Sequence, residues 1–465
     1  MYNKIGRIHM VGIGGSGMSG IAEVLLTMGY EVSGSDLSRT PVTDRLVALG
    51  ARVAAGHRAE LVHGASVVVA STAVRGTNPE VQEANRLRIP VIARAEMLAE
   101  LMRMKYGVAV AGAHGKTTTT SLVAAVLGEG GFDPTVVVGG RLRAMGSSAR
   151  LGTGDFIVAE ADESDGSFLR LNPSIAVVTN VDREHLDHWT GGLDQILEAF
   201  TTFANKVPFY GLVVACLDDA NVRRILPGVG RRLTTYGTGS DAVYRAAEVR
   251  CHEDFSVSFD VHEKGFLLGR ARLQMPGRHN ALNALAAVAV GRELGMRVAD
   301  IFEALGSFAG VARRFEQKGE EAGVLVVDDY GHHPSEIAAV LRAAREHSKR
   351  RLVVLFQPHR YTRTRDLLPE FGTCFSQADL VFLAPLYEAG EDPIEGVSSA
   401  SIHGEVERTG GTDCRLIEDA DGMVPAVRAH LRPGDLVITL GAGNVWKAGE
   451  VLLEELARHG AGVGV

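Results

Sequence analysis

The hydrophobic positions of the chain form short buried-strand patterns that alternate with helix-like segments. From Ile5 to about Leu101, the Val- and Ile-rich runs are GRIHMVGIG, EVSGSD, ASVVVAS and IPVIAR. Such alternation is typical of βαβ units around a parallel sheet. It predicts a first α/β domain of Rossmann-like type over residues 1–104.

A second series of buried-strand patterns begins with YGVAVAGAHGK and continues through TVVVGG, DFIVAEADE, SIAVVTNVD and GLVVACLDD. Each run ends in polar residues or glycines, so we expect these to gather at one sheet edge. Between Asp241 and Pro276 the pattern changes to alternating segments such as FSVSFDVH, which predict a small antiparallel appendage. We therefore expect a second domain, residues 105–310, with a P-loop ATPase-like parallel sheet and that appendage.

A third series contains VLVVDDY, RLVVLFQ, DLVFLAPLY and GDLVITLGAG and ends in the amphipathic segment WKAGEVLLEELARH. It predicts a C-terminal Rossmann-like domain over residues 311–465. A chain of 465 residues also fits about three domains of roughly 150 residues each. Three open sheets can surround a shared cleft with the loops at their strand ends, which suits chemistry with several substrates.

Composition narrows the class of protein. With 46% hydrophobic and 22% charged residues, and no apolar run long enough for a bilayer, the chain is typical of a globular protein without a membrane partner. The start MYNKIGRIHMVGIGG lacks a separate apolar signal region, so we expect a cytoplasmic protein. Four widely spaced cysteines favour reduced thiols, and the net charge of -8 argues against nucleic acid as a partner.

The stretch VAVAGAHGKTTTT, residues 108–120, predicts a phosphate-binding loop between a strand and a helix. Backbone N–H groups at a helix N-terminus donate to phosphate oxygens, and glycines allow close approach of the backbone. Lys116 supplies positive charge and Thr117 a hydroxyl ligand for magnesium. Only Ala113 and His114 separate Gly112 from Gly115, so the strict GxxxxGK[ST] pattern is not met and a standard GTPase is disfavoured.

Two later strands of this domain end in EADESD and TNVDREHLDH, which places carboxylates and imidazoles beside the phosphate loop. Magnesium prefers a few hard oxygen ligands, and phosphoryl transfer needs its charge. Thr117, Glu160 and His185 are the candidate metal ligands. Asp162 or Glu163 can take the role given to Glu160, and His185 can instead bind a second metal or orient the carboxylate.

The first glycine motif, Gly12, Gly14 and Gly17, follows a strand, and Asp36 lies 19 residues after Gly17. This spacing meets the dinucleotide fingerprint and leaves a dehydrogenase as an alternative. The physical demand is only that a helix N-terminus approaches a diphosphate, so UDP satisfies it equally well. Ser71 and Thr72, at the end of ASVVVAST, are further candidates for this pocket, although strand-end hydroxyls also act as helix caps.

The motifs DDYGHHP and FQPHRYTRT follow two strands of the third domain, which we expect to be adjacent. Together they favour a site for an anionic amino acid, although DDYGHHP alone is also compatible with a tight turn before Pro334.

Taken together, AGAHGKTTTT, EADESDGSFL, TNVDREHLDH, PGRHNALNALAA, GVARRFE, DDYGHHP and FQPHRYTRT resemble the Mur ligases, in the order typical of that family and over all three domains. The resemblance implies an ATP-dependent ligase that forms an acyl phosphate and joins it to an amine, with ATP and Mg2+ as cofactors. It also implies UDP-N-acetylmuramate and L-alanine as substrates, and a monomer or weak homodimer. In several Mur ligases a carbamylated lysine follows the DH-type histidine, but here the segment 198–200 occupies that place and the next lysine is Lys206. This difference resembles the alanine-adding branch of peptidoglycan precursor synthesis and removes carbamate from the expected cofactors.

The resemblance also implies roles for individual residues. The UDP-sugar site comprises Gly12, Gly14, Gly15, Ser16, Gly17, Met18, Asp36, Ser71 and Thr72. The ATP site comprises Gly112, Ala113, His114, Gly115, Lys116, Thr117, Thr118, His279, Asn283 and Arg314. Tyr330, His332, Arg360 and Arg363 form the amino-acid site, and Lys116, His185, His332 and Arg360 take part in the reaction. Open alternatives are a ligase that recycles a whole peptide, folylpolyglutamate synthesis, and a non-catalytic nucleotide-binding module.

Overall fold

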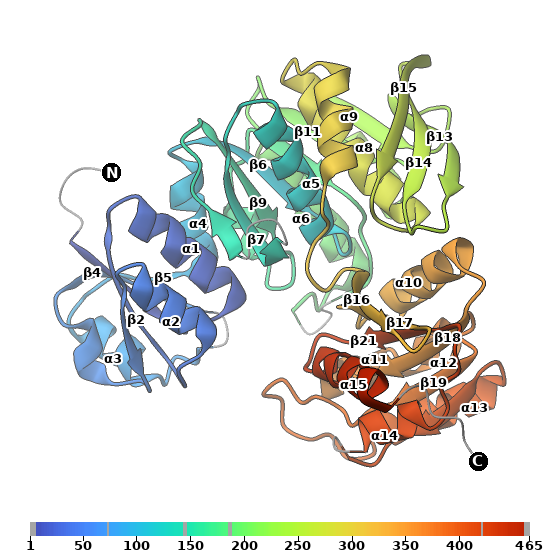
Figure 1. Ribbon diagram of the computed structural model, residues 1–465. Coiled ribbons are helices and arrows are strands. Elements are labelled where there is room, and N and C mark those ends of the chain that lie inside the picture. Colours follow the sequence, from blue (N-terminus) through green and yellow to red (C-terminus); the bar gives the residue numbers. More distant parts are fainter. Residues whose placement is uncertain (1–5, 72–73, 143–146, 185–187, 420–421, 460–465) are drawn as a thin grey trace. The chain divides into compact units, whose positions relative to one another are not determined.

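The structure is a computed structural model that describes residues 6–71, 74–142, 147–184, 188–419 and 422–459 (Figure 1). The chain divides into two compact units. The first unit contains Met1–Glu248, Phe259–Arg272 and Leu282–Val311, and the second contains Val249–Ser258, Leu273–Ala281 and Ala312–Val465. Three sheets organise these units, which confirms the expected α/β class.

The N-terminal sheet is parallel throughout, with the strand order β3-β2-β1-β4-β5. The chain runs outward from β1 to β3 and then continues on the other side of β1, so the order reverses between β1 and β4. Loops that follow strands at such a point diverge and leave room for a ligand, as in Rossmann-like folds. The elements are β1 (Arg7–Val11), α1 (Ser16–Thr27), β2 (Glu31–Asp36), α2 (Pro41–Ala48), β3 (Arg52–Ala55), η1 (Ala59–Val62), β4 (Ala65–Ala70), α3 (Pro79–Arg86), β5 (Val91–Ala93) and α4 (Arg94–Met102).

The central sheet has the order β15-β14-β13-β12-β11-β10-β6-β9-β7-β8. Strand β6 lies in its middle, and Val108, Ala109, Val110 and Ala111 are fully buried. A strand that is covered on both faces has a continuous apolar sequence, which explains the run VAVA before the glycines. The elements up to β12 are β6 (Tyr106–Ala111), α5 (Lys116–Glu129), β7 (Thr135–Leu142), β8 (Ser147–Arg150), β9 (Phe156–Ala161), η2 (Ser167–Arg170), β10 (Ile175–Val178), α6 (Gly192–Asn205), β11 (Leu212–Cys216), α7 (Ala220–Ile225), η3 (Leu226–Gly228) and β12 (Leu233–Gly237).

The predicted appendage extends the same sheet. Strands β14 and β15 are joined by the two-residue turn Lys264–Gly265, whose φ angles of 49° and 85° are those of a tight antiparallel hairpin. The remaining elements are β13 (Tyr244–Cys251), β14 (Val257–Glu263), β15 (Phe266–Leu273), α8 (Arg278–Glu293) and α9 (Val298–Ser307).

The C-terminal sheet has the order β16-β17-β21-β18-β19-β20, with β16 antiparallel to β17 and the other pairs parallel. Consecutive residues face opposite sides, so Val326 belongs to one core cluster and Val327 to another. Helices therefore cover both faces of this sheet. Its elements are β16 (Glu316–Glu321), β17 (Val324–Asp329), α10 (Pro334–His347), β18 (Arg351–Phe356), α11 (Tyr361–Asp366), α12 (Leu368–Cys374), β19 (Leu380–Leu383), α13 (Ser399–Thr409), β20 (Asp413–Leu416), α14 (Met423–Arg428), β21 (Asp435–Leu440) and α15 (Trp446–His459).

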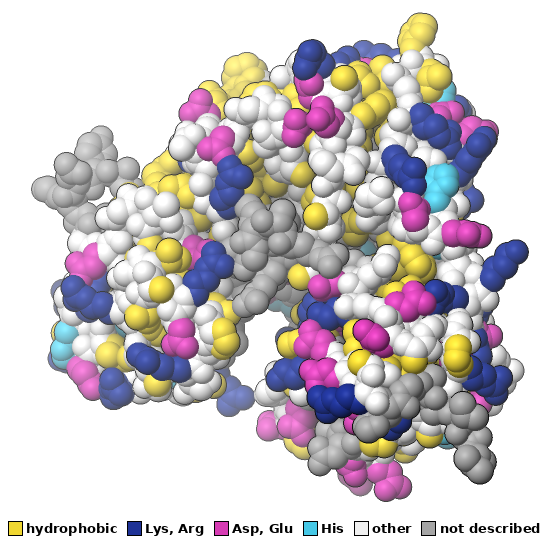
Figure 2. Space-filling model, viewed as in Figure 1, with side chains coloured by type: hydrophobic (Ala, Val, Ile, Leu, Met, Phe, Trp, Pro, Cys, Tyr) yellow, Lys and Arg dark blue, Asp and Glu magenta, His cyan; other side chains and the backbone are white. Residues whose placement is uncertain are grey.

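The surface mixes charges of both signs. On the face drawn in Figure 2, Lys and Arg side chains are interspersed with Asp and Glu side chains over the described residues. Within the described part of the chain, no helix combines the length and apolar character that crossing a membrane requires.

Candidate active site

The loop between β6 and α5 has a backbone that requires glycine at two positions. Gly112 has φ of 141°, and a Cβ atom placed there would lie 2.0 Å from Thr179 Oγ1. Gly115 has φ of 79° and precedes the first residue of α5, so the backbone N–H groups of the first helical turn follow it directly. These are the close-approach geometry and the helix N-terminus that phosphate binding needs.

Lys116 lies folded over this loop. Its ammonium donates hydrogen bonds to Gly112 O at 2.6 Å, to Ala113 O at 3.0 Å and to Glu163 Oε1 at 3.0 Å. Burial disfavours the charged ammonium, but the carboxylates of Glu163, Asp162 and Glu184 outweigh it and raise the pKa of Lys116. The Lys116 ammonium is therefore charged at neutral pH and lies next to the loop backbone.

Two residues directly after β10, Thr179 and Asn180, hold the loop by hydrogen bonds, and neither was among the candidates predicted from the sequence. Asn180 Oδ1 accepts a hydrogen bond from His114 N at 2.8 Å, and Asn180 Nδ2 donates to His114 O at 2.9 Å. Thr179 Oγ1 donates to the same carbonyl at 2.8 Å. The only signal was their position within TNVD at the end of a strand predicted to lie near the loop.

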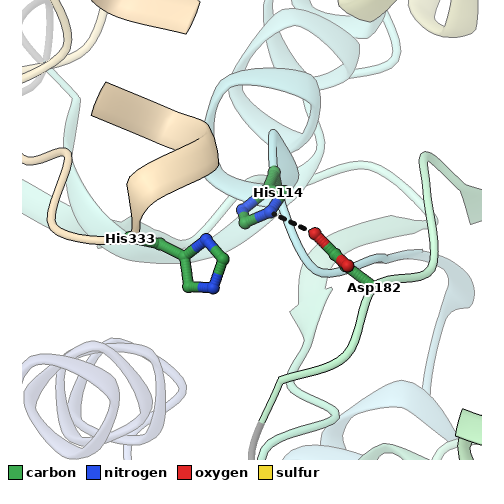
Figure 3. A group of neighbouring side chains, drawn as sticks. All are labelled: His114, Asp182 and His333. Atoms are coloured by element: carbon green, nitrogen blue, oxygen red, sulfur yellow. Dashed lines mark hydrogen bonds and ion pairs between the residues drawn. The ribbon is translucent and has the colours of Figure 1, made fainter. Parts of the chain in front are cut away.

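His114 points from the loop toward the carboxylates that follow β10, as Figure 3 shows for Asp182. His114 Nε2 lies 3.4 Å from Asp182 Oδ2 and 3.5 Å from Glu184 Oε1. The imidazole thus ties the phosphate loop to the segment in which the sequence placed His185. His185 itself lies outside the described residues.

The predicted acidic loop lies beside the phosphate loop, because β9 and β10 flank β6 on either side. Glu160, near the end of β9, is in register with Val110 of β6, and Thr117 is the second residue of α5. Hydroxyl and carboxylate oxygens are the donors that Mg2+ prefers, so this pair fits that ion. The buried Glu163, which the sequence offered only as an alternative to Glu160, instead contacts Lys116.

Asn283 of α8 lies against the start of α5. A Cβ atom at Gly115 would be 2.8 Å from Asn283 Oδ1, which also accepts a hydrogen bond from Thr119 Oγ1 at 3.2 Å. The structure therefore brings Asn283 to the phosphate loop. Thr118 is buried in the first turn of α5.

The first glycine loop follows β1 and is closed by Asp36. Gly14 N donates to Asp36 Oδ2 at 2.7 Å, so the acid at the end of β2 holds the loop directly. A Cβ atom at Gly12 would lie 3.3 Å from the Cβ of Ser71, which places the end of β4 beside the loop. Gly15 precedes α1, and Ser16, Gly17 and the buried Met18 begin that helix; Thr72 lies outside the described residues.

In the second unit, the residues expected at the amino-acid site follow β17 and β18. The expectation that these strands are adjacent is wrong, because β21 lies between them. The last strand of the chain inserts into the middle of the sheet, so neighbours in the strand series are not neighbours in space. The two loops still meet, since the rings of His332 and His359 are 6.0 Å apart.

His332 has a defined orientation in this site. Its Nδ1 donates to Tyr330 O at 3.0 Å, which leaves Nε2 as the acceptor of the neutral ring. Burial, reinforced by the cation of Arg363, lowers the pKa of His332 to about 3 in spite of Glu336. The imidazole is therefore neutral at pH 7.

Three arginines surround the same two loops. Arg314 lies 5.4 Å from the ring centre of Tyr330, and Arg363 donates to His359 O at 3.1 Å. Arg360, the N-cap of α11, has φ of 75° and donates its N–H to Tyr387 O at 2.9 Å. A non-glycine residue in this conformation is strained, and such strain is common at ligand sites. His279, at the start of α8, also belongs to this unit.

Three family models match successive parts of the chain. A model described as the Mur ligase family catalytic domain matches residues 7–106, the Mur ligase middle domain matches residues 110–291, and the Mur ligase glutamate ligase domain matches residues 313–443.

Full-length relatives give the same result. The chain is 56% identical to the UDP-N-acetylmuramate–L-alanine ligase of Geobacter sulfurreducens, over 98% of this chain and 99% of that protein. It is also 56% identical to the protein of that name in Anaeromyxobacter dehalogenans, over 97% and 98% of the two chains. Among solved structures, the UDP-N-acetylmuramate-alanine ligase of Thermotoga maritima matches with a TM-score of 0.82 and 29% identity, over 97% of this chain and 99% of that one. A murein peptide ligase from Psychrobacter arcticus matches over 97% and 98% with a TM-score of 0.71 and 23% identity, which shows the shared fold alone.

Proposed function

The chain belongs to the Mur ligase family, and from that premise we propose that it joins L-alanine to the lactyl carboxylate of UDP-N-acetylmuramate with conversion of ATP to ADP and phosphate. The observation that carries the choice of substrates is the 56% identity to ligases of that name over 98% of the chain. The proposal assigns the UDP-sugar to residues 1–104, ATP to residues 105–310 and alanine to residues 311–465. It includes a cytoplasmic reaction in peptidoglycan precursor synthesis, carried out by a monomer or weak homodimer.

The phosphate loop supports the first step, in which the lactyl carboxylate attacks the γ-phosphorus of ATP and forms an acyl phosphate. Gly112 and Gly115 allow the triphosphate to approach the backbone, and Lys116 neutralises charge on the transferred group. Thr117 and Glu160 are the oxygen donors that would hold Mg2+, with His185 as a further candidate ligand. When bound, the ion neutralises the phosphate oxygens and aligns them for transfer. The protein contributes mainly position and charge, because phosphoryl transfer needs little covalent help.

The second step is attack by the alanine amine on the acyl carbon, after which phosphate leaves from a tetrahedral intermediate. Arg360 and Arg363 suit the carboxylate of the amino acid, because a guanidinium forms paired hydrogen bonds with it. His332 is neutral and offers Nε2 as an acceptor for the amine. The pKa of His332 is about 3, so its ring holds a proton taken from the amine only weakly. Its expected role is therefore to orient the amine by a hydrogen bond.

We also assign His279, Asn283 and Arg314 to the binding of ATP. Asn283 holds the start of α5 through Thr119, so its support for ATP binding includes the shape of the phosphate loop. Arg314 is oriented by Tyr330 and lies 3.7 Å from Glu336, which keeps its charge near the loop that follows β17.

The test is phosphate release in the presence of ATP and UDP-N-acetylmuramate with each amino acid in turn. Alanine is expected to support turnover, and a Lys116→Ala variant is expected to lose it. The competing function is ligation of a whole peptide, so the acceptor L-Ala-γ-D-Glu-meso-diaminopimelate is compared with alanine. Turnover with that tripeptide and none with alanine would overturn the assignment, as would full activity in Lys116→Ala.

A further inference from the structure

The guanidinium of Arg94 lies directly on the first glycine loop. Arg94 is the first residue of α4 and one-fifth exposed (20%), and its side chain reaches the first turn of α1. A Cβ atom at Gly17 would be 2.8 Å from Arg94 Nη1 and 3.3 Å from Cζ. The arginine can therefore occupy this position only because residue 17 has no side chain.

The other end of the same guanidinium faces the acidic loop of the central sheet. Arg94 Nη2 lies 3.5 Å from Asp162 Oδ2. Asp162 stands two residues after Glu160 and immediately before Glu163, the partner of Lys116. One arginine thus joins the two loops to which the UDP-sugar and ATP are assigned.

The hydrogen-bond donors of the glycine loop and of Arg94 favour an anion at this loop. The N-terminus of α1 has no acidic residue in its first turn, and its N-cap Gly15 offers no side chain to accept from the helical N–H groups. Backbone donors and a guanidinium together match a diphosphate, whereas either alone is a weaker partner. Asp36 occupies Gly14 N, which leaves the side of the loop near Gly17 and Arg94 for the ligand.

We propose that Arg94 binds the diphosphate of the UDP-sugar and that Asp162, from the ATP-binding domain, is the residue that positions it. This inference rests on the proposed function for the identity of the ligand. Asp162 fixes the direction of the guanidinium and satisfies the donors that face away from the glycine loop. The consequence is that a residue of the ATP-binding acidic loop controls affinity for the other nucleotide.

The experiment measures binding of UDP and of uridine to the full chain by calorimetry, without ATP or alanine. Arg94→Ala is expected to weaken UDP binding by about ten-fold to one hundred-fold and to leave uridine binding unchanged. Arg94→Lys keeps the charge but not the fork and is expected to recover part of the loss. Equal weakening of UDP and uridine, or UDP binding as tight as in the original chain, would overturn the proposal.

The role of Asp162 is tested by a double-mutant cycle. In the original chain, Asp162→Asn is expected to weaken UDP binding by about three-fold or more. In the Arg94→Ala variant, the same substitution is expected to have no further effect on UDP binding. If the losses of UDP binding free energy from the two substitutions add in the double variant, Asp162 does not act through Arg94 and the positioning role is contradicted. Arg170→Ala, which breaks the ion pair between Arg170 and Glu96 of the same helix, is the control and should leave UDP affinity unchanged.

Because this experiment contains no ligation step, its result is independent of the acceptor. UDP binding that depends on Arg94 in a protein that fails to ligate alanine would support the inference and refute the proposed function. If the protein ligates alanine but its UDP affinity does not depend on Arg94, the proposed function is supported and the inference is refuted.

Discussion

The ammonium of Lys116 lies 2.9 Å from Glu163 Oε2 and donates to Glu163 Oε1 at 3.0 Å. Glu163 is 3% exposed, and its burial outweighs the attraction of Lys116 and raises the pKa of its carboxyl. Trp189 Nε1 donates to Glu163 O at 3.1 Å and holds the backbone of this residue. The phosphate-binding lysine is therefore paired with a fixed internal carboxyl group, and a γ-phosphate must compete with that group for the ammonium.

We predict that Glu163→Gln tightens binding of ATP by about three-fold to ten-fold, because the neutral amide competes less well for Lys116 and no longer repels the phosphate. The same variant is expected to melt at a lower temperature, since Lys116 loses its buried counter-charge. Calorimetry with ATP alone and thermal unfolding measure the two effects. Weaker ATP binding in the variant would show that Glu163 supports the nucleotide instead of competing with it.

Asp165→Asn is the matched control for this variant. Asp165 lies in the same loop and accepts a hydrogen bond from Ser167 N at 3.0 Å, so the substitution removes the same charge without touching the partner of Lys116. Its ATP affinity should stay within about two-fold of the original value.

A second prediction concerns the clamp on the phosphate loop. Asn180→Ala removes the hydrogen bonds to His114 N and His114 O, each worth about 0.5–1.5 kcal/mol. A loop that is less ordered before binding must be ordered by the nucleotide, so the KM for ATP is expected to rise about ten-fold. Steady-state kinetics with saturating alanine and UDP-sugar provide the measurement.

The control for the clamp is Asn221→Ala. Asn221 Nδ2 donates to Val181 O at 2.8 Å. The variant therefore removes a side-chain amide that is bonded to the residue after Asn180 instead of to His114. An unchanged KM for ATP in Asn180→Ala, or an equal rise in Asn221→Ala, would contradict the clamp.

The phosphate loop was predictable because its signals are local. A parallel strand that is buried on both faces is apolar throughout, as in residues 108–111, and the first polar or glycine residue after it marks the carboxyl edge of the sheet. Glu160 lies near the end of another such strand, β9, which is why the sequence placed it near Lys116. The order β10-β6-β9 confirms that the two polar strand ends flank the loop.

Contacts between distant residues were not predictable in the same way. Asn180 lies 66 residues from His114, and no spacing rule relates an amide at one strand end to the carbonyl of another loop. Arg94 appeared only as the end of the strand pattern IPVIAR, and its contact with Gly17 depends on how α4 packs against α1. Strand β16 was missed because EQKGEE is a polar edge strand without an apolar alternation.

The order of the C-terminal sheet was also beyond the reach of the pattern. The strand GDLVITLGAG is as apolar as its neighbours, and nothing in it indicates that β21 pairs with both β17 and β18. The assumption that successive strands are adjacent therefore failed at this position.

A third prediction concerns His347, which links two segments of the second unit. Its Nε2 accepts a hydrogen bond from Gly277 N at 3.0 Å, and its Nδ1 donates to His252 O at 2.7 Å. Both bonds require the neutral ring, and burial lowers the pKa of His347. His347→Phe is expected to lower the free energy of unfolding by about 2 kcal/mol at pH 7.5, because a buried and a partly buried backbone group lose their partner.

The pH dependence of this link has a definite sign. The folded pKa of His347 lies below its ordinary value, so the unfolded chain takes up the proton first and the stability from His347 is lost as the pH falls through about 6.5. The difference between the original chain and His347→Phe should therefore shrink between pH 7.5 and pH 5 in urea unfolding. A constant difference would contradict the neutral-ring requirement. His403→Phe, at a half-buried histidine of α13, is the control. Its loss of unfolding free energy at pH 7.5 should be smaller than that of His347→Phe.

The last prediction concerns Asp329, at the end of β17, where the sign of the pH effect is opposite. Burial raises the pKa of Asp329 to about 6, although Gly331 N and Phe315 N each donate to its carboxylate at 2.7 Å. The folded chain therefore holds the proton between pH 4 and pH 6, whereas the unfolded chain releases it. Relative to Asp329→Asn, the original chain is expected to gain about 2 kcal/mol of unfolding free energy as the pH falls from 7.5 to 4.5. The two backbone N–H groups donate to different carboxylate oxygens, so the asparagine keeps an acceptor for only one of them. That loss does not vary with pH, and the change in the difference with pH therefore isolates the titration of Asp329. A gain in the variant equal to that in the original chain would show that Asp329 is ionised throughout this range and that the positive charge of Arg314 offsets its burial completely.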